Sequence, residues 1–88
     1  MTLELKKEND KGKTYVTDKC KILYRNKGTI AGENDTAPEE LIYLITGTAK
    51  ITIKEKVFEV EAPAEIFIPA KTYHSIEAIT DISFVLFD

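Results

Sequence analysis

The only histidine of this chain is the residue best suited to chemistry. His74 stands in the stretch IPAKTYHS, residues 68–75, five positions after Pro69. A neutral imidazole binds transition metals, and it also accepts and donates protons near neutral pH. One imidazole does not make a metal site, so its role depends on the side chains that the fold brings to it.

The carboxylate of Glu40 is the first partner that the pattern of the chain suggests for His74. Side chains alternate between the two faces of a strand, so His74 shares its face with Ile76, and Glu40 shares its face with Ile42. We therefore expect both polar groups to point into the apolar interior. A buried carboxylate without a partner is costly enough to take up a proton. Pairing with His74 would remove that cost, either as a structural pair or as part of a binding site.

Alternation of apolar and polar residues dominates the chain from about residue 14 onward and predicts an all-β protein. The predicted strands cover residues 13–17, 21–25, 40–46, 49–54, 57–61, 65–68, 73–79 and 82–87. Glycines and prolines separate these segments, as expected for turns. About eight short strands in succession predict a sandwich or a barrel.

Length and composition set the limits of the fold and of the partners. The 88 residues fit one domain, 1–88, in which 1–13 is a charged N-terminal arm or an edge strand. A formal net charge of −3 without a clustered basic face argues against nucleic-acid binding. No apolar run reaches the length of a membrane span, and no signal pattern opens the chain, so we expect a cytoplasmic protein. Cys20 is the only cysteine, which excludes an internal disulfide.

Two of the predicted strands, 40–46 and 82–87, are apolar on both faces. A small barrel needs only its inner face to be apolar, so the second face of these strands must cover something else. Two-fold self-association is the commonest way to cover such a face. The sequence therefore predicts a homodimer.

The spacing of several residues resembles the first conserved motif of the cupins, G-x5-H-x-H-x3-4-E-x6-G. In this chain the corresponding positions hold Gly28, Asn34, Thr36, Glu40 and Gly47. Every interval matches, although both histidines of the motif are replaced. The resemblance covers about residues 20–88 and implies a jelly-roll, or double-stranded β-helix, barrel.

The second cupin motif, G-x5-P-x-G-x2-H-x3-N, matches the stretch that contains His74. Its proline and histidine correspond to Pro69 and His74, at the same spacing. The other positions differ, because Pro63 and Lys71 stand where glycines are usual and Ala78 stands where asparagine is usual. Two degenerate motifs in the right order are more specific than either one alone.

In metal-binding cupins, the two histidines and the glutamate of the first motif and the histidine of the second hold a divalent metal. The resemblance carries these roles to Asn34, Thr36, Glu40 and His74, of which only the last two are strong ligands. The metal implied would be Zn, Mn, Fe or Ni. Sites for these ions generally have at least three strong protein donors, so the sequence indicates no certain cofactor.

A shift of the loop by one residue gives an alternative set of donors. Glu33 and Asp35 would then take the places of the two missing histidines. With Glu40 and His74 they would form a site of three carboxylates and one imidazole, in which most donors are hard oxygen ligands. This shift loses the match to Gly28.

Three hypotheses for function follow, and they leave open whether the protein is an enzyme. In the first, a small cupin-domain protein binds a small polar molecule in its barrel through His74, Glu40, Asn34 and Thr36. In the second, His74 and Glu40 are catalytic. The resemblance then implies a metal-dependent oxygenase, isomerase or decarboxylase acting on a small acid or sugar, or a metal-free reaction with His74 as general base. In the third, the barrel is packed and the protein is a structural or interaction module.

Overall fold

The computed structural model describes residues 1–87, except for the side chain of Asn34. Ten strands form in this part of the chain. They are β1 (Leu5–Asn9), β2 (Gly12–Val16), β3 (Lys21–Arg25), β4 (Ile30–Asn34), β5 (Glu40–Thr46), β6 (Thr48–Ile53), β7 (Lys56–Glu61), β8 (Ala64–Ile68), β9 (His74–Ala78) and β10 (Ile82–Phe87). The described residues contain no helix that is long and apolar enough to cross a membrane.

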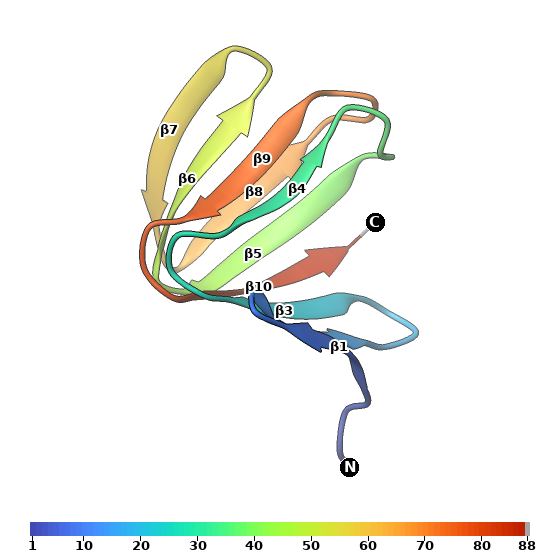
Figure 1. Cartoon of the computed structure of the whole chain (residues 1–88). Coiled ribbons are helices and arrows are strands. Elements are labelled where there is room, and N and C mark those ends of the chain that lie inside the picture. The colour runs from blue at the N-terminus through green and yellow to red at the C-terminus, as the bar shows by residue number, and fades with distance from the viewer. Residues whose placement is uncertain (88) are drawn as a thin grey trace.

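The strands form two antiparallel sheets, which confirms the all-β prediction. The larger sheet has the order β1-β2-β3-β10-β5-β8, and the smaller sheet has the order β4-β9-β6-β7. Figure 1 shows the hairpin of β1 and β2 at the opposite end of the molecule from the hairpin of β6 and β7. Several neighbouring strands are far apart in sequence, as in a jelly roll, so the ends of the chain help to build one barrel.

The core lies between the inner faces of the two sheets. Ile42 and Leu44 of β5 and Phe84 of β10 are almost fully buried on the larger sheet. Ile51 of β6 and Ile76 of β9, which are paired in register, are buried on the smaller sheet. Alternate residues of β5, β6, β8 and β9 thus enter the core, which is the pattern that the sequence predicts for these segments.

The outer face of the larger sheet is also apolar. β5 and β10 are neighbours in this sheet, with Tyr43 opposite Val85, and the rings of Tyr43 and Phe87 meet edge to face at 5.9 Å. Ile45 and Phe67 lie on the surface with about half of their area exposed, 53% and 52%. The two strands that are apolar on both faces therefore present one of those faces to the outside.

β4 was not among the strands expected from the sequence, and β1 lies within residues 1–13, where an arm or an edge strand was expected. β1 has the sequence LKKEN and is exposed along its whole length, so it shows no alternation between a buried and an open face. It pairs only with β2, at the edge of the larger sheet. β4 is interrupted by an irregularity in its pairing with β9 between Ala31 and Asn34, where Gly32 adopts a φ of +65°. A glycine and a bulge break the period of two that reveals a strand in sequence.

Candidate functional site

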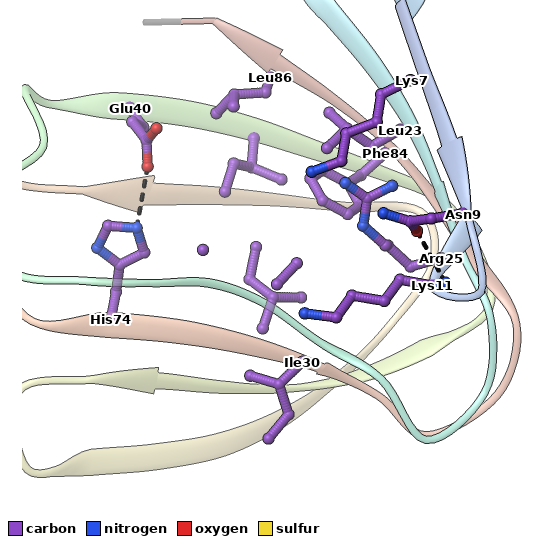
Figure 2. A pocket seen from close by; sticks show the side chains of 14 residues that line it. Lys7, Asn9, Lys11, Leu23, Arg25, Ile30, Glu40, His74, Phe84 and Leu86 are labelled. Atoms are coloured by element: carbon purple, nitrogen blue, oxygen red, sulfur yellow. Dashed lines mark hydrogen bonds and ion pairs between the residues drawn. The ribbon is translucent and has the colours of Figure 1, made fainter. Parts of the chain in front are cut away.

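Glu40 and His74 meet inside the barrel, each at the first position of its strand. Glu40 opens β5 in the larger sheet and His74 opens β9 in the smaller sheet. The Oε1 atom of Glu40 lies 3.0 Å from Nε2 of His74, and the two side chains are only 12% and 3% exposed. Figure 2 shows the pair bridging the space between the sheets. Both side chains thus have the inward orientation that strand parity predicts.

Two loops that precede these strands hold the pair in register. The backbone N–H of Lys71, in the loop before β9, donates to the carbonyl of Ala37, in the loop before β5, at 2.8 Å. The next residue, Thr72, is buried and its carbonyl lies 2.9 Å from Nδ1 of His74. The imidazole is therefore fixed at both nitrogens, one by the backbone and one by Glu40.

This arrangement determines where the protons of the imidazole must be. The carbonyl of Thr72 can only accept, so Nδ1 of His74 carries a hydrogen and donates it. The contact between Nε2 and Glu40 then needs one more proton, which belongs either to an imidazolium beside a carboxylate or to a carboxylic acid beside an imidazole. In both forms the pair has no net charge and holds one proton that can move between its two atoms.

The pair lies in the wall of a cavity of about 210 Å³. The apolar part of its lining includes Leu23, Ile42, Ile76, Phe84 and Leu86. Ligand sites in proteins commonly combine an apolar wall with a few polar groups that fix orientation. The barrel is thus hollow at this point.

The far end of the cavity is positively charged. Lys7 of β1, Lys11 of the following turn and Arg25 at the end of β3 all line it. Figure 2 shows these three side chains together at the side of the cavity opposite Glu40 and His74. Sequence reasoning missed this cluster, and only Arg25, which shares the inward parity of Leu23, carried a signal that could have revealed it.

Arg25 is half-buried, and its guanidinium bonds mainly to the backbone. Nη1 donates to the carbonyls of Lys13 and Tyr24 at 3.1 and 2.9 Å, and Nη2 donates to Oγ1 of Thr14 at 3.1 Å. Burial lowers the pKa of Arg25 from its usual value, because the charged form loses solvation. The bonds hold the cation rigidly at the cavity end without neutralising it.

Gly32 lies beside the ring of His74. A Cβ atom at this position would lie 3.6 Å from Nε2 of His74, in ordinary contact with the ring. The positive φ of Gly32 also favours glycine over other residues. Gly32 lines the same cavity, so a larger side chain here would occupy space next to the imidazole.

The structure places the other predicted site residues differently. The backbone of Asn34 lies opposite His74 in the pairing of β4 and β9, while its side chain lies outside the described part of the chain. Thr36 and Asp35 are exposed, and Glu33 is exposed and accepts a hydrogen bond from the hydroxyl of Tyr73 at 3.3 Å. None of these three lines the cavity.

The donors that converge in this cavity do not fit a transition metal. Among the described side chains, no group of three His, Cys, Asp or Glu residues is placed to hold an ion. Glu40 and His74 contribute one carboxylate and one imidazole, whereas three strong donors are the usual minimum.

Comparison with known proteins identifies the fold. No protein-family model matches the chain, and no curated protein matches it. Among solved structures, an RmlC-like cupin from Shewanella frigidimarina is similar over 97% of this chain and 82% of its own, with a TM-score of 0.80 and 14% identity.

Two larger proteins contain a similar unit. The capsular polysaccharide assembling protein CapF from Staphylococcus aureus matches 99% of this chain, with a TM-score of 0.81 and 16% identity. Salicylate 1,2-dioxygenase from Pseudaminobacter salicylatoxidans matches 77%, with a TM-score of 0.72 and 15% identity. The chain spans only 28% and 20% of the lengths of these proteins. These similarities confirm that the chain has the cupin fold.

Proposed function

We propose that this cupin-fold protein binds a small polar molecule in the barrel, with Glu40 and His74 as its polar anchors. The observation that carries the proposal is the position of the pair, which is held 3.0 Å apart in the wall of a 210 Å³ cavity. A packed barrel that served only as an interaction module would need no such space.

The chemistry of the pair suits a ligand that carries a hydroxyl or a carbonyl group. The carboxylate of Glu40 accepts hydrogen bonds, and the shared proton allows the pair to donate one. The bond from Nδ1 of His74 to the carbonyl of Thr72 keeps the ring from rotating, so Nε2 stays directed at Glu40 in the cavity wall. A ligand would meet polar groups that are already oriented, which reduces the entropic cost of binding.

Binding can be followed directly, because His74 is the only histidine and gives one set of imidazole signals in NMR. We expect neutral polar compounds such as glycerol, hydroxyacetone or 1,4-butanediol to shift these signals at up to about 10 mM. Glu40→Gln should change the shifts that the added compound causes. Glu59→Gln, on exposed β7, should leave these shifts as in the wild type. If neither these neutral compounds nor a short carboxylic acid moves the ring signals of His74, the proposal is wrong.

A second candidate function is proton transfer. It is favoured by the 3.0 Å contact between Nε2 of His74 and Oε1 of Glu40, two side chains that line the cavity. A positioned acid–base pair of this kind accelerates proton abstraction next to a carbonyl group. Its test is deuterium incorporation from D₂O into a small ketone or keto acid. The rate should fall to the uncatalysed level in His74→Ala, and equal rates for the two proteins would exclude this function.

We also infer that two copies associate through the outer face of the larger sheet. The exposed apolar side chains of this face, including Ile45 and Phe67, lie beside the aromatic pair of Tyr43 and Phe87. Exposed apolar side chains that gather on one face favour association. A second copy offers the same surface for two-fold pairing.

A further inference from the structure

We propose that the molecule bound in the barrel is a short carboxylic acid, whose carboxylate contacts Arg25, Lys7 and Lys11. This inference rests on the proposed function and adds the chemical class of the ligand. Its basis is the division of one cavity into a cationic end, an apolar middle and a proton-sharing end at Glu40 and His74.

The cations at the cavity end lack acidic partners within residues 1–87. The ion pairs described in this range join Lys13 to Glu8, Lys50 to Glu77 and His74 to Glu40, so none includes a cation from the far end of the cavity. The whole chain has a net charge of −3. The cavity end, with three cations that have no ion-pair partner among the described residues, is therefore positive although the protein as a whole is negative. Such an accumulation of one sign attracts an ion of the other sign.

Arg25 still has hydrogen-bonding capacity for a ligand. A guanidinium has five N–H donors, and three of them bond to Lys13, Tyr24 and Thr14. The other two have no partner among the described residues. Two N–H groups on one planar guanidinium match the two oxygens of a carboxylate. A half-buried cation that has lost solvation would gain from this contact.

The lysines are placed by a hairpin whose turn is itself fixed. The side-chain oxygen of Asn9 accepts a hydrogen bond from the backbone N–H of Lys11 at 2.9 Å, which Figure 2 shows beside Arg25. Both lysines are exposed, and their side chains are long enough to follow a ligand. Lys7 and Lys11 can therefore contact a carboxylate that is bound to the more rigid Arg25.

The size of the cavity limits the ligand. A water molecule occupies about 30 Å³ in the liquid, so 210 Å³ corresponds to about seven waters. This is the size of an acid with about four carbons. Because Glu40 and His74 share one proton without net charge, a ligand with a hydroxyl or carbonyl at its other end meets no repulsion there.

A matched pair of probes tests the inference on the full chain. 4-Hydroxybutanoate and 1,4-butanediol have the same length but differ in charge, and inorganic phosphate serves as a competing anion. Arg25 is the only arginine and His74 the only histidine, so the side-chain NMR signals of the two residues report on the two ends separately. We expect the acid to shift both signals and to bind at least about tenfold tighter than the diol.

Charge-removing variants should abolish this preference. The double variant K7Q/K11Q changes only exposed side chains, and Arg25→Gln removes the guanidinium. In both we expect the acid to bind no tighter than the diol. The control K19Q/K56Q makes the same change in net charge at exposed lysines that do not line the cavity, and it should bind like the wild type. Unchanged acid binding in K7Q/K11Q and in Arg25→Gln would overturn the inference.

The remaining outcomes separate this inference from the proposed function. If the diol shifts the His74 signals and binds as tightly as the acid, the preference for a carboxylate is refuted, while binding in the barrel stands. If phosphate binds at Arg25 more tightly than the acid, the anion recognised is a phosphate group and the carboxylate is ruled out. If neither the acid nor the diol shifts either signal, both proposals fail.

Discussion

Nε2 of His74 lies 3.0 Å from Oε1 of Glu40, although the two residues belong to different sheets and are 34 positions apart in sequence. Because Nδ1 of the same ring donates to the carbonyl of Thr72, the pair must hold one shared proton. The two sheets are thus joined inside the barrel by a polar contact that is also available to a ligand.

Substitutions of Glu40 and His74 should lower the free energy of unfolding by different amounts. His74→Ala leaves the nearly buried carboxylate of Glu40 without its partner, and we expect a loss of about 2 kcal/mol in the free energy of unfolding. Glu40→Gln retains a hydrogen bond to Nε2 and should cost less than about 1 kcal/mol. Urea denaturation measures both values. Equal losses in the two variants would contradict the expectation that a glutamine at position 40 preserves the contact with Nε2.

A side chain at Gly32 should disturb the imidazole as well as the backbone. Gly32→Ala is expected to cost about 1 kcal/mol because φ is +65°, and to shift the NMR signals of the His74 ring. Gly28 provides the control, since its φ is +89° and a Cβ there would meet nothing within 4 Å. Gly28→Ala should cost a similar free energy without moving the ring signals. If the ring signals of His74 were the same in the two variants, a side chain at position 32 would not contact the imidazole.

Alkaline pH should weaken the fold partly through Tyr43. A hydrogen bond to Glu65 and the negative charge of that carboxylate raise the pKa of Tyr43. The stabilisation is fully present below the pKa of tyrosine in the unfolded chain, about 10, and is lost as pH rises through the higher value of the folded state. In Tyr43→Phe the free energy of unfolding should fall less steeply above about pH 10. Urea denaturation at pH 8 to 11 measures this difference.

Tyr24 offers a control for that experiment, because its hydroxyl makes no hydrogen bond with the described residues. In Tyr24→Phe the free energy of unfolding should fall above about pH 10 as steeply as in the wild type. The role of Glu65 would be refuted if Tyr43→Phe lost stability with the same dependence on pH as the wild type.

Metal loading should remain low. The cavity supplies two strong donors, so we expect less than about a tenth of a Zn, Mn, Fe or Ni ion per chain after exposure to the metal and gel filtration. Elemental analysis of the wild type and of His74→Ala gives the comparison. A full equivalent of metal that disappears in His74→Ala would show that further ligands complete a site.

Self-association should depend on the outer face of the larger sheet. Phe67→Lys places a charge on the exposed apolar surface that we infer to be the contact between copies. Light scattering should then report the monomer mass, while the wild type has twice that mass. Val57→Lys, at an equally exposed apolar position on β7 of the other sheet, should leave the dimer intact. A wild-type protein of monomer mass would refute this interface.

The parts of the site that lie on regular strands could be predicted from the sequence. Period-two alternation gave the inward direction of Glu40 and His74, and the spacing of the two motifs indicated the fold. The bond from His74 to Thr72 could not be predicted, because it depends on the loop before β9. The same holds for the hollow interior, since the size of a cavity depends on how the two sheets pack.

The cationic end of the cavity was missed for a different reason. Lys7 belongs to an edge strand that is exposed at every position, so its sequence has no buried face to recognise. Lys11 lies in a turn, where periodicity gives no direction. Their common position becomes visible only when the hairpin is placed beside β3.

The position of that hairpin also separates ligand exchange from unfolding. β1 and the turn that follows it carry two cations of the cavity, yet among residues 1–87 none of the buried apolar core residues belongs to β1 or β2. The hairpin is joined to the rest of the sheet by the pairing of β2 with β3 and by hydrogen bonds from Arg25 and Asn26. Local opening of an edge costs less free energy than global unfolding. We therefore expect a molecule bound in the barrel to exchange by local opening of this hairpin, while the core between β5, β10, β6 and β9 stays closed.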